Sequence, residues 1–139
     1  MTEFIQFVND QLLLFALLIG LIAMFIANTV MHYTQKYKDI SVNEAVTLMD
    51  DTKLTIIDTR ETKERTAGHI AKDVHIPMKQ LQSKLSTLKK EAKFLVYCRN
   101  GSRSPHSARA LTKAGFANVY NLNGGFNAWV KANLPITKT

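Results

Sequence analysis

Cysteine is almost absent from this chain of 139 residues, which contains only Cys98. A single cysteine excludes an intramolecular disulfide and every metal site that is built from several cysteines. It is typical of a protein that works in a reducing compartment. Internal repeats and low-complexity stretches are absent as well, and the length leaves room for one modest domain.

Positive charge is missing from the first part of the chain. Every Lys and Arg lies after Met31, whereas Glu3 and Asp10 precede it, although the formal net charge of the whole chain is +7. The lysines are scattered, and the sequence contains no arginine-rich tract or aromatic platform, so we expect no nucleic-acid partner. The charge favours attraction to anionic lipids or to anionic substrates.

Residues 12–31 contain no charge of either sign. A helix of this length rises about 30 Å, which is the thickness of the hydrocarbon core of a bilayer. We therefore expect a transmembrane helix at 12–31, which binds the membrane after a short extracytoplasmic N-terminus at 1–11. A buried core helix and a cleaved signal peptide are the alternatives. The signal peptide is disfavoured because the acidic start lacks a basic segment and Asn28–Met31 lacks a small-residue cleavage site.

The flanks of this stretch predict its orientation. Lys36 and Lys38 follow it, and no basic residue precedes it, so the N-terminus should lie outside and the domain in the cytoplasm. The protein would then be a single-pass membrane protein, in the inner membrane if the source is bacterial. Tyr33 and Tyr37 suit the membrane interface, although tyrosines are also ordinary in linkers.

The soluble part predicts an α/β fold. Ser41–Glu44 has the pattern of a capping box that opens a helix, so we place a juxtamembrane tether at 32–39 and the domain at 40–139. Short apolar runs at 54–57, 74–76, 94–97 and 119–122 alternate with helical patterns around 79–88, 105–114 and 126–132. This alternation predicts an open parallel sheet with helices on both faces. Asp58 and Cys98 each follow a strand and should meet at its carboxyl edge.

The residues around Cys98 point to a reactive thiol. Gly101 and Ser102 favour a tight turn, and Ser104 with Pro105 should cap and open the next helix. The backbone N–H groups of such a turn form a cradle for an anion, to which the helix dipole adds. A lone cysteine after an apolar strand is more often inert, but this context favours the thiolate.

Several motifs in order resemble the rhodanese, or sulfurtransferase, family from Ser41 to Ala132. They are Ile56–Arg60 with its Asp-x-Arg pattern, Glu64, Gly68–Ile70, Ile76–Pro77, the strand Phe94–Tyr97 with the loop from Cys98, and Gly124–Trp129. The resemblance implies a membrane-anchored member of the single-domain rhodanese-like proteins. Related phosphatases have five residues between Cys and Arg, whereas only four separate Cys98 from Arg103. The shorter loop is similar to that of the sulfur-handling branch.

The resemblance implies a sulfurtransferase. Sulfane sulfur from thiosulfate or a persulfide would pass to Cys98 as a persulfide, and then to a thiol, or to cyanide in an assay. Catalysis would lie with Cys98, and substrate binding with the loop residues Arg99, Asn100, Gly101, Ser102 and Arg103. The supporting residues would be Asp58, Arg60, Glu64 and Ser104, with a carboxylate that pairs with Arg103 or bonds loop amides. Ordinary surface charges are the alternative for the three charged residues.

The sequence departs from the family pattern after Glu64, where Arg65–Thr66 stands at the usual aromatic position and should alter the rim or the surface packing. His69 should be a structural residue of its turn, and the other histidines are scattered. We therefore expect no metal and no cofactor. Trp129 should be core or pocket-wall packing.

Two other functions remain open. The domain could be an interaction module that recruits membrane-protein partners with little sulfur transfer, an alternative that the membrane helix motivates. A phosphatase or arsenate reductase is disfavoured by the short loop.

Overall fold

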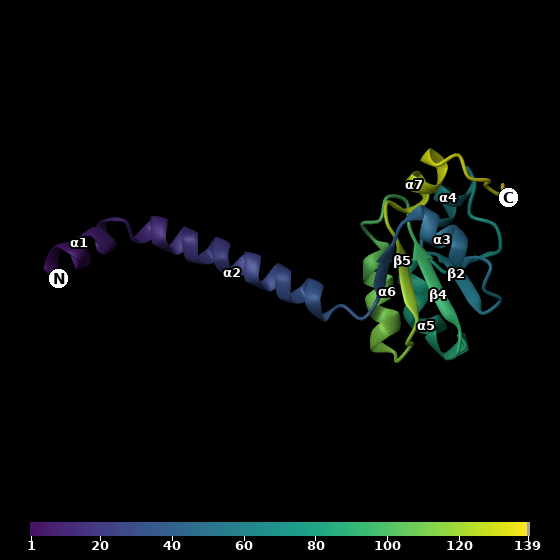
Figure 1. Cartoon of the computed structure of the whole chain (residues 1–139), viewed down its shortest axis with the longest axis horizontal. Coiled ribbons are helices and arrows are strands. Elements are labelled where there is room, and N and C mark those ends of the chain that lie inside the picture. Colours follow the sequence, from purple (N-terminus) through teal and green to yellow (C-terminus); the bar gives the residue numbers. More distant parts are fainter. Residues whose placement is uncertain (139) are drawn as a thin grey trace. The chain divides into compact units, whose positions relative to one another are not determined.

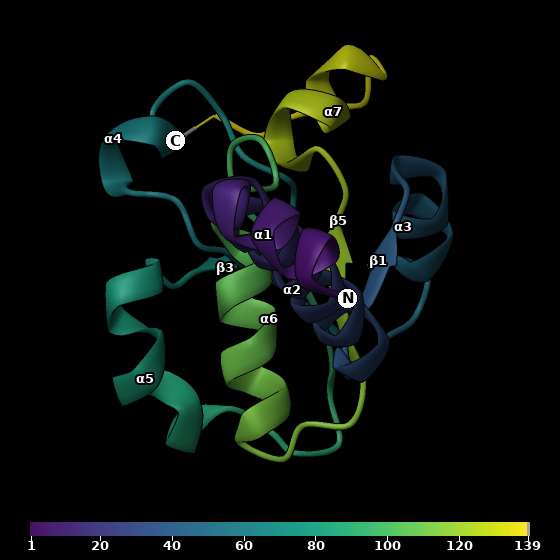
Figure 2. The same ribbon diagram turned by 90° about the vertical axis from the view of Figure 1, so that its left-hand side faces the viewer.

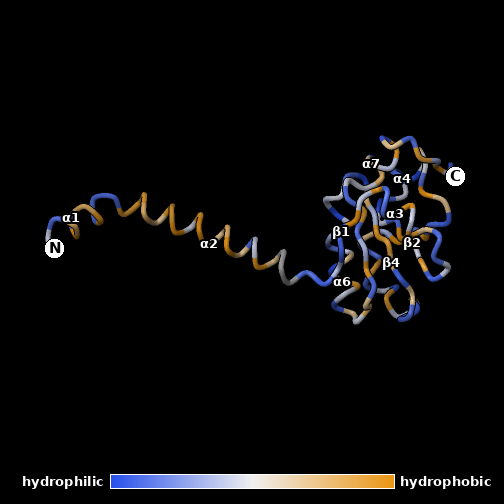
Figure 3. The backbone as a smooth tube through the Cα atoms, in the orientation of Figure 1, coloured by the Kyte–Doolittle hydropathy of each residue, from blue (hydrophilic) through white to orange (hydrophobic). Residues whose placement is uncertain are grey.

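The computed structural model describes residues 1–138, with the side chains of residues 32–34 outside the description. The chain divides into two compact units, Met1–Gln35 and a second unit that begins at Lys36. The first unit contains α1 (Thr2–Asp10) and α2 (Leu12–Thr34). Within α2, Leu12–Met31 has a mean hydropathy of 2.5 and is long and apolar enough to cross a membrane, as Figure 3 shows by its colour. Signal sequences share this length and composition. The helix α1 was not expected from the sequence.

The second unit contains all the strands of the structure (Figure 1). Its elements are β1 (Lys38–Ile40), α3 (Val42–Leu48), β2 (Leu54–Asp58), α4 (Thr62–Arg65), β3 (Asp73–His75), the 3₁₀ helix η1 (Met78–Gln80), α5 (Leu81–Lys84), the 3₁₀ helix η2 (Leu85–Thr87), β4 (Lys93–Tyr97), α6 (Ser104–Lys113), β5 (Val119–Leu122) and α7 (Gly125–Lys131).

The strands form one parallel sheet in the order β1-β5-β4-β2-β3, which confirms the expected fold class. Alternate residues of the central strands face opposite layers, because side chains in a strand alternate between the two faces. On one face, Phe94 and Val96 pack with residues of α5 and α6, which lie side by side in Figure 2. On the other face, Leu95 packs with residues of α3 and α7. Both faces are therefore covered, and the site is left at the carboxyl edge.

The four predicted strands are all present, whereas β1 was missed. Its sequence Lys38–Ile40 has only one buried residue and no apolar run that could have announced a strand. It pairs with β5 in the register Ile40↔Leu122, so it belongs to the sheet and not to a tether. The compact unit consequently begins at Lys36, inside the segment 32–39 that the sequence assigned to the tether.

Tyr37 lies in the domain core and not at a membrane interface. It is only 6% exposed and belongs to the cluster that includes Ala108 and Leu111 of α6. Burial of its ring against apolar side chains is favourable, and this contact outweighs the interfacial position expected for a tyrosine that follows an apolar stretch. The expected helix at 79–88 is also broken into η1, α5 and η2.

Candidate functional site

The loop Cys98–Arg103 joins β4 to α6 at the carboxyl edge of the sheet. Cys98 is fully buried, and its Sγ accepts a hydrogen bond of 3.2 Å from the backbone N–H of Gly101. Thr59 fixes the residue before it, since both its N–H and its hydroxyl donate to the carbonyl oxygen of Tyr97 at 3.0 Å. The sulfur is thus held by the rigid end of a strand on one side and by a tight turn on the other.

Two opposite effects act on the pKa of Cys98. Burial on its own raises the pKa of the thiol, because it disfavours the charged form. Hydrogen bonds from Ser104, through side chain and backbone, and from the backbone of Arg103 and Gly101 favour the thiolate. These donors outweigh burial, and the pKa of Cys98 lies below its ordinary value. A thiol with this shift is biased toward the nucleophilic form.

Ser104 has a different partner from the one expected. The helix α6 begins at Ser104, one residue earlier than the sequence predicted, and Arg103 occupies the N-cap position without a side-chain cap. The Ser104 hydroxyl donates to Asn121 Oδ1 at 2.6 Å, and Asn121 Nδ2 donates to Asp39 Oδ1 at 2.8 Å. Because one hydroxyl carries one proton, the Ser104 hydroxyl donates either to Asn121 or to the sulfur, whereas the backbone N–H groups serve the sulfur without losing another partner.

Arg103 is paired with Glu64. Its two terminal nitrogens donate to the two carboxylate oxygens of Glu64 at 2.9 and 2.5 Å, a bidentate pair of the expected kind. The pair holds the pKa of Glu64 below its ordinary value, chiefly through the hydrogen bond from Arg103. The other side chains of the loop behave differently. Arg99, Asn100 and Ser102 are exposed, and Asn100 Oδ1 accepts hydrogen bonds from the backbone N–H and the hydroxyl of Ser102.

Asp58 and Arg60 form a buried ion pair at the end of β2. Their side chains are 0% and 2% exposed, and Arg60 NH2 lies 2.8 Å from Asp58 Oδ2. Arg60 also donates to the carbonyl oxygens of Glu64 at 3.2 Å and Gly68 at 2.9 Å. Burial alone raises the pKa of Asp58, but the hydrogen bonds from Arg60 reverse this, and the pKa of Asp58 is lowered. The pair therefore anchors the segment that carries Glu64, and so acts on the loop through Arg103.

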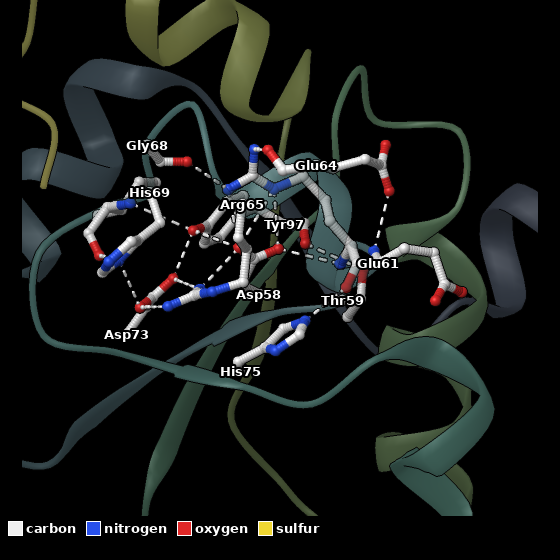
Figure 4. A network of polar contacts seen from close by, with 12 residues as sticks. Asp58, Thr59, Glu61, Glu64, Arg65, Gly68, His69, Asp73, His75 and Tyr97 are labelled. Carbon is white, nitrogen blue, oxygen red and sulfur yellow. Dashed lines mark hydrogen bonds and ion pairs between the residues drawn. The ribbon is translucent and has the colours of Figure 1, made fainter. Parts of the chain in front are cut away.

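Arg65 lies inside this network, which corrects the expectation that it alters a rim (Figure 4). Its NH1 lies 2.8 Å from Asp58 Oδ2 and 2.6 Å from Asp73 Oδ2, and its side chain is 12% exposed. The Tyr97 hydroxyl lies in the same group, 2.5 Å from Asp73 Oδ2 and 3.0 Å from Asp58 Oδ2, so its one proton serves one of the two carboxylates at a time. The two arginines, Arg60 and Arg65, offset the charge of the two buried carboxylates. An unpaired charge in the protein interior would lower the stability of the fold.

His69 joins the same group as a structural residue, which agrees with the expectation from its turn. Its Nδ1 lies 2.9 Å from Asp73 Oδ1 and 3.1 Å from the carbonyl oxygen of Ile70. Asp73, Tyr97, Asn121 and Asp39 were all missed by the sequence. The sequence offered one indication of these residues, which is that each is a polar residue within a strand or next to a strand. Trp129 is core, as expected, and is 3% exposed.

Gly124, which caps α7, and Gly125, its first residue, close the back of the loop. The backbone N–H groups of Phe126 and Asn127 donate to the carbonyl oxygens of Cys98 and Arg99 at 2.8 and 2.9 Å. Gly125 has φ +58°, and a Cβ there would collide with the Cys98 carbonyl oxygen and would lie 2.9 Å from the Gly101 nitrogen. The glycine pair therefore provides more than the sharp helix entry expected from the sequence, because it lets α7 approach the loop backbone.

Residues 41–132 match the rhodanese-like domain. The chain belongs to the rhodanese-like family. It is 39% identical to thiosulfate sulfurtransferase GlpE of Coxiella burnetii over 99 residues, which are 71% of this chain and 92% of that protein. It is 30% identical to the uncharacterized protein YibN of Escherichia coli over 141 residues, which are 99% of both chains.

The rhodanese-like fold is also shared with solved structures. A rhodanese-related protein from Thermoplasma volcanium superposes with a TM-score of 0.69 at 27% identity, over 74% of this chain and 100% of that one. The similarity to GlpE covers 71% of this chain. The similarity to YibN extends across the N-terminal apolar helix as well.

Proposed function

We propose that this protein is a membrane-anchored sulfurtransferase that carries sulfane sulfur on Cys98. The observation that supports this is a buried sulfur in a six-residue loop, with its pKa lowered by donors of that loop. The name of the relative GlpE, a thiosulfate sulfurtransferase, indicates the same class of reaction. The donor would be thiosulfate or a persulfide, and the acceptor a thiol.

The reaction proceeds in two displacements. The Cys98 thiolate attacks the outer sulfur of the donor, a new S–S bond forms, and the donor's own S–S bond breaks, so that thiosulfate leaves sulfite with the electron pair. The Cys98 persulfide is then attacked at its terminal sulfur by a thiolate, or by cyanide in an assay, and the Cys98 thiolate leaves. The acceptor comes from another molecule, because the chain contains no second cysteine.

The loop residues take distinct parts in this proposal. The N–H groups of Gly101, Arg103 and Ser104 stabilise the charge on the thiolate and on the terminal sulfur of the persulfide. Arg99 and Arg103 supply positive potential for an anionic donor, while Asn100 and Ser102 hold the turn. Asp58, Arg60 and Glu64 position the loop without touching the sulfur.

Mass spectrometry of the full chain after thiosulfate treatment tests the proposal. We expect one added sulfur atom on Cys98, its release by cyanide as thiocyanate, and neither event in Cys98→Ala. Ser83→Ala, on the exposed surface of α5, is the control that should transfer sulfur normally. No sulfur on Cys98 after treatment, or undiminished cyanide-dependent turnover in Cys98→Ala, contradicts the proposal.

The proposed anchor is the helix Leu12–Met31, in a single pass with the N-terminus outside and the domain in the cytoplasm. Its length and apolar composition support the span, and Lys36 and Lys38 on its C-terminal side support the orientation. We place it in the inner membrane if the source is bacterial. A protein that recruits partners to the membrane would need a membrane anchor as well. The second candidate function is therefore an interaction module for membrane-protein partners. Crosslinked partners that Cys98→Ala retains and that replacement of residues 12–31 removes would favour this candidate.

A further inference from the structure

We propose that α1 is an interfacial helix whose apolar face lies against the lipid at the N-terminal end of α2. This inference rests on the proposed anchoring role of α2. It adds a second contact with the membrane, made by residues that the span does not include. The partner is the lipid surface itself, without a requirement for anionic headgroups.

The sequence of α1 is amphipathic over its whole length. At 3.6 residues per turn, the apolar side chains of residues 1–10 fall on one side of the helix, and the polar side chains fall on the other. The apolar face consists of Met1, Phe4, Ile5, Phe7 and Val8. The polar face consists of Thr2, Glu3, Gln6, Asn9 and Asp10. A loop or a continuation of the span would not require this separation.

The apolar face is open. Phe4 is 71% exposed, Ile5 63% and Phe7 57%, and no residue of α1 is buried. Phe7 meets the ring of Phe15 in α2 edge to face, with the ring centroids 6.3 Å apart. This contact covers one edge of the apolar face and leaves Phe4 and Ile5 for another partner.

Chain connectivity places lipid beside this face. Only Gln11, with the non-helical ψ of 18°, separates α1 from α2. The twenty residues Leu12–Met31 already fill the hydrocarbon core, so α1 has no place inside it, and Glu3 and Asp10 would oppose its entry. A helix that ends one residue from the core boundary remains in the interfacial layer, where amphipathic helices insert an apolar face among the lipids.

The charge of α1 indicates that its contact with lipid is hydrophobic and not electrostatic. The helix contains no Lys or Arg, and both of its charged side chains are acidic. Burial of apolar side chains is then the driving force, because anionic headgroups would repel Glu3 and Asp10. The contact should be equally strong on vesicles of neutral phosphatidylcholine, which distinguishes it from binding by a basic amphipathic helix.

The single native cysteine makes a direct test practical. In the full chain with Cys98→Ser, a nitroxide label is attached to a cysteine introduced at one position at a time along α1, and the protein is reconstituted in phosphatidylcholine vesicles. Collisions are measured with oxygen, which dissolves in lipid, and with a neutral nickel chelate present in the water on both sides. We expect positions 4, 5 and 8 to be accessible to oxygen and protected from nickel, and positions 2, 6 and 10 to show the reverse.

Each other outcome overturns the proposal. Nickel access at all positions of α1 would place the helix in water, and low access to both reagents would place it against protein, either a second copy or a partner. Positions 19 and 22 of α2 are the internal control, with oxygen access expected. If the control positions are open to nickel, the anchor fails and α1 with it; if they are in lipid while α1 is not, only this inference fails. Trp129 fluorescence in each labelled variant checks that the domain is folded.

Discussion

At Cys98, burial and hydrogen bonding oppose one another on a single sulfur atom. Burial would protect the proposed persulfide from stray nucleophiles, but it raises the pKa of the thiol, whereas the hydrogen-bond donors lower it. The Ser104 side chain is one of these donors, and the backbone N–H groups of Ser104, Arg103 and Gly101 are the others, which no side-chain substitution removes. A sequence can indicate such a cradle through Gly101 and the helix start, but it cannot give the sign of the balance.

The titration of Cys98 should therefore occur at a lower pH than that of an ordinary cysteine, which titrates near pH 8.5. Thiolate forms as the pH rises through the pKa, so a lowered pKa moves the midpoint toward acid. Ser104→Ala removes the side-chain donor and should move the midpoint toward alkaline pH. The ultraviolet absorbance of the thiolate measures this, with Cys98→Ser as the blank.

Ser107→Ala is the matched control on the same helix. The Ser107 hydroxyl is buried and has no hydrogen-bond partner among the described residues, so its removal should leave the midpoint unchanged. A midpoint that moves equally in both variants, or a wild-type midpoint above the ordinary value, would contradict the assignment of the donors.

At the same scale, the sequence predicted that a carboxylate pairs with Arg103, and the structure identifies it as Glu64, whereas the role of Cys98 as nucleophile stays a prediction. Both predictions follow from local patterns. The chain from Ser104 through Asn121 to Asp39 could not be predicted, because its members lie far apart in the sequence and their residue types are common on surfaces.

Among the elements, the ends of β2, β3 and β4 are joined by a polar network where most sheets have apolar packing. Arg65 of α4 bridges Asp58 of β2 and Asp73 of β3, and the hydroxyl of Tyr97 of β4 lies within hydrogen-bond distance of both carboxylates. The aromatic residue usual at the position of Arg65 could not fill this role. The presence of Asp73 explains the departure from the family pattern, since one buried charge requires the other.

Loss of Arg65 should consequently destabilise the domain. Arg65→Phe leaves Asp73 without its arginine, and we expect the free energy of unfolding to fall by about 3 kcal/mol. Adding Asp73→Ala should recover part of this loss, because the buried charge is removed as well. The measurement is urea unfolding of the full chain in detergent, followed by Trp129 fluorescence. It is made on the wild type, the two single variants and the double variant, which together form a double-mutant cycle.

The control for this cycle is the surface pair of Lys93 with Asp51, whose side chains are 33% and 28% exposed. Asp51→Ala should cost a small fraction of the Arg65 effect, because exposed pairs contribute little. Strictly additive losses at Arg65 and Asp73 would show that the two residues act independently.

The junction of α7 with the Cys98 loop gives a second test among the elements. Gly125→Ala should reduce sulfur transfer and cost several kcal/mol, because its Cβ would collide with the loop backbone in addition to the strain at positive φ. Gly115→Ala also places an alanine at positive φ, +94°, but its Cβ would meet only Lys90 Nζ at 3.5 Å, and it should cost about 1 kcal/mol. Thermal unfolding and thiocyanate formation measure both; equal effects of the two variants would exclude the collision.

The elements that the sequence predicted are those with strong periodicity. The strands around Ile57 and Val96 are apolar on both faces, as buried parallel strands are. The short elements β1 and α4 were missed because their order comes from tertiary partners, the β5 ladder for β1 and the Arg60 and Arg65 contacts for α4.

For the whole molecule, the proposed topology predicts where each end of the chain is found. A fluorescent protein fused after residue 139 should fluoresce, and alkaline phosphatase fused there should be inactive, because that enzyme requires an oxidising compartment. Alkaline phosphatase fused before residue 1 should be active. Phosphatase activity at the C-terminal fusion would reverse the orientation, and release of the chain by alkaline carbonate would exclude the span.

The position of β1 has a mechanical consequence. The chain that leaves α2 enters the sheet through this strand, so tension on the proposed anchor would reach the domain first at the three residue pairs of β1 with β5 on the sheet edge. If β1 peels from β5, Asp39 departs with it, and Asn121 loses the acceptor that orients its amide toward Ser104. The edge pairing of β1 with β5 is thus connected, through Asn121, to the helix that begins six residues after Cys98.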